Sequence, residues 1–182
     1  MEQSAAIRKP FPNSYPVTGP HLFAGEYPGA RTAEAAREKL AGLLDAGVTH
    51  CIDLTEEGEL YTYEEILAEL ADARGVTVVH ERLPIPDMDV PHPSRMLEIL
   101  DAIDAARSAG RVTYVHCWGG IGRTGTVIGC HLVRHGLGGE DALAQVQRLY
   151  DTMSAEKRSY HPDSPQTEEQ RAFVLGWTER ER

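Results

Sequence analysis

One short run of the sequence places a nucleophile, a cation and flexible backbone close together. It reads His116-Cys117-Trp118-Gly119-Gly120-Ile121-Gly122-Arg123-Thr124-Gly125, with five residues between the cysteine and the arginine. Glycines let consecutive backbone N–H groups turn the same way and form a concave site for an anion. The Arg123 guanidinium would add a planar pair of donors that fits two phosphate oxygens. The run therefore predicts a site for a phosphate group.

The elements on either side of this run should aim its groups at one point. Residues 112–115 predict a short buried strand, and residues 126–135 have the apolar spacing of a helix. A helix that begins near Arg123 would direct the positive end of its dipole into the anion site. The same groups stabilise a thiolate, so we expect Cys117 to be a nucleophile at neutral pH. Thr124 can donate its hydroxyl to the sulfur and help it leave.

The pattern His-Cys-x5-Arg-Thr resembles the signature of the protein tyrosine and dual-specificity phosphatase superfamily. The sequence looks closest to the compact dual-specificity branch, of the cyclin-dependent-kinase-associated phosphatase type, whose loop also has an aromatic residue followed by Gly-Gly, here at 118–120. The likeness covers most of the chain after about residue 20. It implies a cysteine-dependent phosphomonoester hydrolase that forms a phosphocysteine intermediate and needs no cofactor or metal.

The resemblance also implies a proton donor for the departing oxygen, since displacement leaves an alkoxide or phenoxide. In this family an aspartate supplies that proton from a loop before the cysteine. The segment Leu83-Pro84-Ile85-Pro86-Asp87 resembles that loop, and Asp87 lies thirty positions before Cys117. We assign Asp87 as general acid and later as the base that activates water. Asp89 is the competing candidate, although a solvated loop carboxylate is its favoured interpretation.

A second segment resembles the family near the end of the chain. Residues 164–170 are similar to the region in which related phosphatases place a glutamine that faces the site. Gln170 is our candidate for orienting water or bracing the arginine loop, with a helix-surface glutamine as the alternative interpretation. Gln166 is a weaker candidate. His116 is expected to fix the loop by hydrogen bonding.

The loop also bears on the substrate. We expect Trp118, Gly119, Gly120, Ile121, Gly122 and Gln170 to contact it. The loop has no lysine, unlike the loops of phosphatases that act on membrane inositides, so a singly phosphorylated side chain is favoured over a polyphosphorylated headgroup. Trp118 could form the pocket wall or pack beneath the loop, and Tyr61 or Tyr63 could recognise an aromatic ring. We expect a shallow site that accepts phosphotyrosine, with phosphoserine or phosphothreonine as possible further substrates.

The rest of the chain alternates predicted strands and helices, which indicates an α/β domain with a mainly parallel central sheet flanked by helices, as in protein tyrosine phosphatases. Predicted strands cover residues 21–24, 48–54, 76–83 and 112–115, and predicted helices follow Thr32 and cover 63–73, 94–110, 126–135, 140–150 and 168–178. Four prolines before residue 21 predict an irregular, extended arm over 1–20, followed by a single phosphatase domain over 21–182.

The composition of the chain argues against some classes of binding partner. The formal net charge of −10 over 182 residues would repel nucleic acid and anionic membranes, and no apolar run approaches the roughly 20 residues that cross a bilayer. The N-terminal residues do not resemble a secretion signal, so we expect a cytoplasmic protein. Three cysteines form no disulfide framework, and Cys51 and Cys130 are expected to be buried, inert thiols.

The remaining histidines, at positions 50, 80, 92, 131, 135 and 161, show no metal-binding spacing, and we expect ordinary surface or packed side chains. Three other functions stay open at this point. They are a soluble inositol-phosphate or other small-molecule phosphatase, a non-catalytic module that binds phosphorylated partners, and a sulfurtransferase of the rhodanese type. The sequence does not indicate the oligomeric state.

Overall fold

The computed structural model of this protein describes residues 7–179. Its centre is a five-stranded sheet in the order β1-β2-β5-β3-β4. β1 pairs with β2 in the antiparallel sense, and the other neighbouring strands are parallel. The strands are β1 (Ser14–Thr18), β2 (Leu22–Gly25), β3 (Val48–Asp53), β4 (Val79–Arg82) and β5 (Val112–His116). The predicted α/β fold with a mainly parallel sheet is confirmed.

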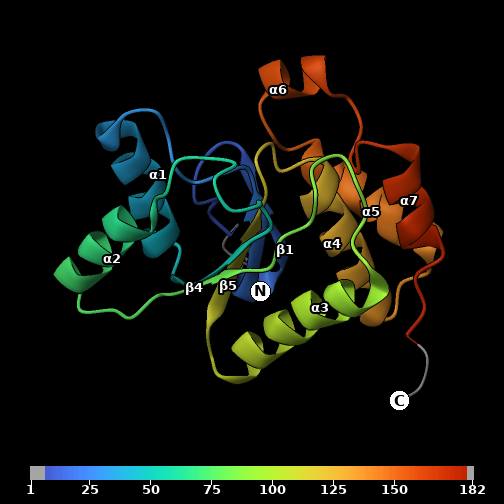
Figure 1. Ribbon diagram of the computed structural model, residues 1–182, viewed down its shortest axis with the longest axis horizontal. Coiled ribbons are helices and arrows are strands. Elements are labelled where there is room, and N and C mark those ends of the chain that lie inside the picture. The colour runs from blue at the N-terminus through green and yellow to red at the C-terminus, as the bar shows by residue number, and fades with distance from the viewer. Residues whose placement is uncertain (1–6, 180–182) are drawn as a thin grey trace, which may run out of the picture.

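Helices cover both faces of the sheet (Figure 1). One side carries α1 (Ala33–Asp45) and α2 (Glu64–Ala73), and the other carries α3 (Pro93–Ser108), α4 (Gly122–Arg134), α5 (Gly139–Tyr150) and α7 (Glu168–Leu175). The expected cap of the first helix is present, because the Thr32 side chain accepts a hydrogen bond from the Ala35 N–H. A 3-10 turn, η1 (Gly19–His21), links the first two strands.

Neighbouring residues of the central strands serve two separate cores, as the alternation of side chains along a strand requires. Ile52 and Val115 belong to the larger core, beneath α3, α4, α5 and α7. Cys51 and Tyr114 belong to the smaller core, beneath α1 and α2. β5 therefore lies at the centre of the molecule, buried on both faces, and the loop that follows it leaves from the carboxyl edge of the sheet, where α/β proteins bind ligands.

The N-terminal segment differs from the irregular arm that the prolines predicted. Ser14–Thr18 forms β1 at the edge of the sheet, where Pro16 is tolerated because an edge strand need not donate every N–H. Tyr15 is fully buried in the larger core. The described part of the predicted arm is thus integrated into the domain, and residues 1–6 lie outside the described residues.

The sequence did not predict α6 (Ala155–Tyr160), which Figure 1 shows projecting at the top of the molecule. This helix buries none of its side chains, so it has no apolar periodicity to detect. Its N-terminal signal is Ser154, whose hydroxyl accepts a hydrogen bond from the Lys157 N–H. The helix matters because Lys157 reaches the loop after β5.

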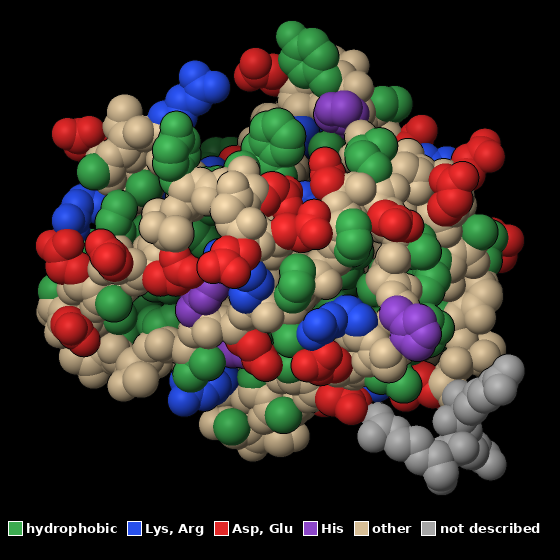
Figure 2. Space-filling view, in the orientation of Figure 1, with side chains coloured by type: hydrophobic (Ala, Val, Ile, Leu, Met, Phe, Trp, Pro, Cys, Tyr) green, Lys and Arg blue, Asp and Glu red, His purple; other side chains and the backbone are tan. Residues whose placement is uncertain are grey.

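Within residues 7–179, no helix combines the length and the apolar character needed to span a bilayer. Figure 2 shows acidic side chains spread among basic and apolar ones over one face, in keeping with the formal net charge of −10.

Candidate active site

Hydrogen-bond donors from other segments hold the loop after β5 by binding to its carbonyl groups. The Trp118 carbonyl accepts a hydrogen bond from the Tyr27 N–H at 2.9 Å, and the Gly119 carbonyl accepts one from Lys157 Nζ at 2.9 Å. The Ser164 hydroxyl donates to the Ile121 carbonyl at 2.7 Å. In a planar trans peptide the N–H points opposite to the carbonyl of the preceding residue. These bonds therefore turn the N–H groups of Gly119, Gly120 and Gly122 away from the three donors.

Cys117 lies at the base of this concave loop and is 3% exposed. The Thr124 hydroxyl donates a hydrogen bond to Cys117 Sγ at 3.1 Å, which is the contact expected from their spacing in the sequence. Cys117 lies five residues before α4 and Thr124 lies in its first turn, at the positive end of the helix dipole. Cys117 Sγ thus has a hydroxyl donor and the N-terminal end of α4 beside it.

Arg123 is 2% exposed and is held in place by an acidic residue that the sequence did not single out. Its Nη1 and Nη2 donate to the two carboxylate oxygens of Glu59 at 2.9 and 2.6 Å. Nη1 also donates to the Ile85 carbonyl at 3.2 Å. The hydrogen bond from Arg123 lowers the pKa of Glu59, which therefore stays ionised at neutral pH. The two-pronged pairing fixes the plane of the guanidinium at the loop.

The loop before α3 brings Asp87 to the same pocket. Asp87 Oδ1 lies 3.1 Å from Arg123 Nη2, and its side chain is 53% exposed. Asp89 instead accepts a hydrogen bond from the adjacent Val90 N–H at 2.7 Å and does not line the pocket. The structure therefore places Asp87, and not Asp89, in the pocket wall beside Arg123.

Gln170 is fully buried and connects the loop that carries Asp87 and Asp89 to the loop between Cys117 and Arg123. Its Nε2 donates to the Asp89 carbonyl at 3.1 Å, and its Oε1 accepts from the Gln166 and Thr167 N–H groups, each at 3.1 Å. It also packs on Gly122, where an added Cβ would lie 2.8 Å from its amide oxygen. The alternative interpretation as an exposed helix-surface residue is therefore wrong, while a part in orienting water stays a prediction.

His116 braces the start of the loop through a buried chain of hydrogen bonds. Its Nδ1 lies 3.0 Å from the Cys117 carbonyl, which can only accept, so Nδ1 carries the proton. Its Nε2 then accepts a hydrogen bond from the Tyr63 hydroxyl at 2.7 Å. Burial lowers the pKa of His116, consistent with this neutral ring. Tyr63, considered from the sequence as a recognition residue, is 2% exposed and has this bracing role instead.

A pocket of about 750 Å³ lies at this loop. Of the predicted contact residues, Trp118, Gly119, Ile121, Gly122 and Gln170 reach its surface, together with Cys117, Arg123 and Asp87. Gly120 does not, because it turns with a φ of +72° against the end of β2. Trp118 is 61% exposed and therefore forms a wall rather than packing beneath the loop.

The pocket wall also contains two lysines that the sequence of the loop did not predict as part of the site. Lys39 of α1 and Lys157 of α6 both line the pocket, and both pair with Glu26, each at 2.8 Å. These lysines lie 118 positions apart (157 − 39), so only the tertiary structure reveals the pairing. The lysines lower the pKa of Glu26 against the opposing effect of burial, and Glu26 in turn offsets part of their positive charge.

The other two cysteines, Cys51 and Cys130, lie in the two hydrophobic cores, away from the pocket. β3 and β5 are neighbours, but Cys51 aligns with Tyr114, three residues before Cys117. Three strand residues span about 10 Å, beyond the roughly 7 Å between Cα atoms that a disulfide allows. Burial raises the pKa of Cys51 to about 12 and raises that of Cys130 as well. The expectation that both thiols are buried is confirmed, and their lack of reactivity stays a prediction.

Comparison with known proteins gives the family to which this site belongs. The PTP-SAK family, described as the DSP-PTPase phosphatase domain of the Swiss Army Knife protein, matches residues 29–174. The chain belongs to this family. The matched range contains the Cys117–Arg123 loop, Asp87 and Gln170, whereas Glu26 and Tyr27 of the pocket wall lie before it.

Individual relatives agree with this assignment. The chain is 43% identical over 56 residues to dual specificity protein phosphatase CDC14B of Mus musculus, covering 31% of this chain and 11% of that protein. It is 30% identical over 92 residues to cyclin-dependent kinase inhibitor 3 of Sus scrofa, covering 50% of this chain and 42% of that protein. These matches thus span less than half of each curated relative. Among solved structures, Tk-PTP in the active form aligns with a TM-score of 0.67 and 28% identity, covering 90% of this chain and 95% of that one.

Proposed function

We propose that this protein hydrolyses phosphate monoesters as a protein tyrosine or dual-specificity phosphatase, through a phosphocysteine formed at Cys117. The observation that carries the proposal is the shared pocket of Cys117, Arg123 and Asp87, with the loop carbonyls bonded on its outer side. That arrangement combines a nucleophile, an anion site and a carboxyl group beside Arg123. Membership of the PTP-SAK family supports it.

In the first step the Cys117 thiolate attacks phosphorus, and the bond between phosphorus and the ester oxygen breaks. Asp87, in its acid form, gives its proton to the departing oxygen. The loop N–H groups and the Arg123 guanidinium hold the phosphoryl oxygens as charge shifts onto them. Glu59 serves this step indirectly, because its two bonds to Arg123 set the direction of the guanidinium.

In the second step water attacks the phosphocysteine, and the Asp87 carboxylate accepts a proton from that water. The sulfur–phosphorus bond breaks, which returns Cys117 as a thiolate and releases inorganic phosphate. The hydrogen bond from the Thr124 hydroxyl, 3.1 Å from Cys117 Sγ, stabilises the departing sulfur. Protons and charges balance over the two steps, and the enzyme returns to its starting form.

The pocket rim favours an aromatic substrate group. Trp118, Tyr61 and Met88 all line the pocket and are 61%, 74% and 50% exposed. Aromatic and thioether side chains around a polar base provide the contacts that a phenyl ring prefers. We therefore propose phosphotyrosine in a protein or peptide as the preferred substrate, with other phosphomonoesters as slower ones.

Lys39 and Lys157 give a second candidate, a soluble inositol phosphate with more than one phosphate. Both lysines line the pocket wall and could meet a second phosphate group. Glu26, however, lies 2.8 Å from each of them and competes for their charge. A polyphosphorylated ligand would have to displace that carboxylate, so we place this candidate second.

Phosphate release from p-nitrophenyl phosphate tests the catalytic proposal, with Cys117→Ser as the control and thermal unfolding to show that both proteins are folded. We expect turnover by the wild type and none by the variant above the uncatalysed rate. A folded wild type as inactive as Cys117→Ser would contradict the proposal and favour a binding module.

A comparison of kcat/KM for phosphotyrosine peptides, phosphothreonine peptides and soluble inositol phosphates tests the substrate. Trp118→Ala should lower kcat/KM for the phosphotyrosine peptide by about 2–10-fold, the value of one aromatic contact. Tyr160→Ala is the matched control, because Tyr160 is 75% exposed but does not line the pocket. Preference for inositol phosphates with no effect of Trp118→Ala would instead support the second candidate.

A further inference from the structure

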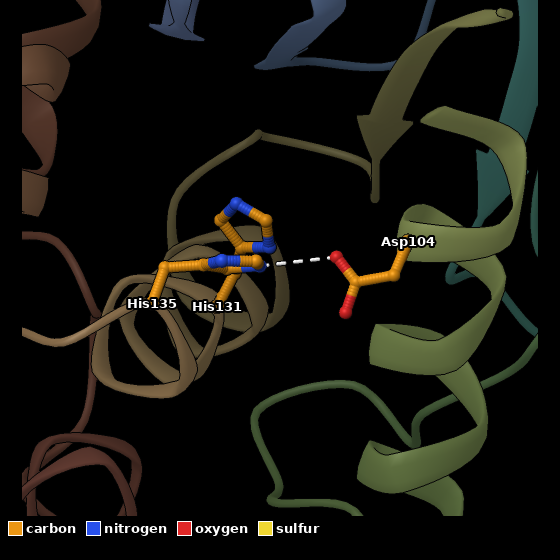
Figure 3. Close-up of side chains that lie close together, drawn as sticks. All are labelled: Asp104, His131 and His135. Carbon is orange, nitrogen blue, oxygen red and sulfur yellow. Dashed lines mark hydrogen bonds and ion pairs between the residues drawn. The ribbon is translucent and has the colours of Figure 1, made fainter. Parts of the chain in front are cut away.

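The strongest cluster of chemically active side chains outside the pocket joins α3 to the C-terminal end of α4. Asp104, His131 and His135 each offer one ligand atom, and these atoms all lie within 4.8 Å of one another. The two histidines are four residues apart on α4, which puts them on one face of the helix. Figure 3 shows their rings close together and tilted against each other, on the side of α4 that faces Asp104.

His131 makes this cluster unusual. Its side chain is 2% exposed, yet its Nδ1 is buried and has no hydrogen-bond partner among the described residues. Buried polar atoms in native proteins are nearly always satisfied, and an exception calls for an explanation such as a bound ion. Among the described residues the protein therefore leaves this buried nitrogen without a partner, which points to a ligand at the cluster.

The carboxylate of Asp104 is oriented as metal-binding carboxylates usually are. Its Oδ1 lies 3.0 Å from His135 Nε2, while its Oδ2 accepts a hydrogen bond from Arg134 Nη1 at 3.0 Å. Arg134 is itself paired with Asp101, 3.0 Å away, and with Glu179. Such outer partners hold the ligands of metal sites in place. One oxygen of Asp104 is therefore fixed by Arg134, and the other faces the two histidines.

The surrounding charge permits a cation. Asp101, Asp104 and Glu179 supply three carboxylates against the guanidiniums of Arg134 and Arg107, for a local balance of −1 (−3 + 2). The cluster also lies at the last turn of α4, the negative end of that helix dipole. The carboxylates and the negative end of the helix dipole offset the repulsion that Arg134 alone would exert on a bound cation.

We propose that Asp104, His131 and His135 bind a divalent transition-metal ion of the Zn²⁺ type, which links α3 to α4. Two imidazoles and one carboxylate are a ligand set that Zn²⁺ accepts, with water in the remaining position. Bonds of about 2 Å place tetrahedral ligand atoms about 3.3 Å apart. His135 Nε2 already lies 3.0 Å from Asp104 Oδ1, so only the spacing to His131, which is at most 4.8 Å, needs adjustment. His135, 38% exposed, is free to make most of that movement.

The ion would act as a brace away from the reaction. Twelve residues of helix separate Arg123 from His135 (135 − 123), a distance of about 18 Å along α4. Binding should therefore stabilise the fold without entering the catalytic pocket. From the sequence these two were expected to be ordinary surface or packed histidines, and their His-x3-His spacing became meaningful only when the fold brought Asp104 of α3 beside them.

The test uses tag-free, full-length protein with Cys117→Ser, so that the nucleophilic thiol cannot bind the metal. Zn²⁺ is titrated in competition with a chromophoric chelator, and Co²⁺ is added separately to record its visible absorption bands. We expect one Zn²⁺ per chain, Co²⁺ bands typical of a four- or five-coordinate site, and a melting temperature that rises with Zn²⁺ and saturates.

His135→Ala and Asp104→Asn, each made in that background, should weaken Zn²⁺ binding at least about tenfold. His21→Ala is the matched control, an exposed histidine outside the cluster, and should leave binding unchanged. If Asp104→Asn loses its fold, His135→Ala decides, since it alters an exposed side chain. The proposal is wrong if the Cys117→Ser protein binds no Zn²⁺, or if both cluster variants bind it as tightly as the His21→Ala control.

Discussion

Gly120 offers a sharp test of how the loop is packed against the sheet. Its φ is +72°, and a Cβ there would lie 2.3 Å from the Gly25 carbonyl carbon and 2.5 Å from Glu26 N. Gly110, after α3, provides the matched control because its φ is +73° and nothing lies within 4 Å of an added Cβ. Alanine at either position meets the same backbone strain, and only at 120 does it also meet neighbouring backbone.

The expected effects of the two substitutions on stability and on rate differ accordingly. A non-glycine residue with positive φ costs about 1 kcal/mol at the lower end of its range, so Gly110→Ala should lower Tm by about 2–4 °C in a domain of this size. For Gly120→Ala an ordinary 3.4 Å contact requires a shift of about 1.1 Å (3.4 − 2.3) between the loop and the end of β2. Misplacing a reacting group by about 1 Å can cost about 10²-fold in rate.

We therefore expect Gly120→Ala to lower kcat/KM about 100-fold and to lower Tm by clearly more than Gly110→Ala does. Thermal unfolding and steady-state hydrolysis of p-nitrophenyl phosphate measure both quantities on the two variants side by side. Gly110→Ala should keep wild-type kinetics. If the two variants had the same Tm and the same kcat/KM, close approach of the loop to β2 would not be what positions the phosphate site.

Three further predictions concern the groups around the loop. Asp87→Asn should lower kcat by about 10²–10⁴-fold, the usual range for a lost proton donor, with Asp89→Asn near wild type; the opposite ranking in steady-state assays would move the acid role to Asp89. Glu59→Gln weakens a charged pair with buried Arg123 and should lower kcat/KM by about tenfold or more, whereas exposed Glu57→Gln should not; equal kinetics would remove Glu59 from the positioning of Arg123. Because burial lowers the pKa of His116, its contribution to stability is present above about pH 6.5 and is lost as pH falls through the lower folded value. Tm should therefore fall more steeply between about pH 7 and about pH 5 for the wild type than for His116→Gln, and parallel curves would contradict this linkage.

The residues that sequence reasoning found are those whose chemistry depends on neighbours along the chain. Cys117, Arg123 and Thr124 occupy one strand-to-helix turn, so their spacing alone brings them to one loop. The same local logic predicted the alternating strands and helices and the cap at Thr32. Fold class and the centre of the site were therefore predictable from short-range patterns.

The residues that were missed depend on contacts between distant segments. Glu59 reaches Arg123 across 64 positions, and Lys157 reaches Gly119 from a helix that buries no side chain. Tyr63 is of a side-chain type that could recognise an aromatic substrate, but packing directs its hydroxyl to His116. Tertiary packing decides such roles, because pattern and spacing carry no information on which loops face one another.

The most direct test of the proposed chemistry is to trap phosphate on the enzyme. The wild-type protein is mixed with a phosphotyrosine peptide labelled in its phosphate, quenched in acid within milliseconds to seconds, digested and analysed by mass spectrometry. We predict transient labelling of the peptide that contains Cys117, and no labelling of Cys117→Ser. Release of inorganic phosphate at the full rate, with Cys117 unlabelled at every quench time, would contradict a covalent phosphocysteine mechanism.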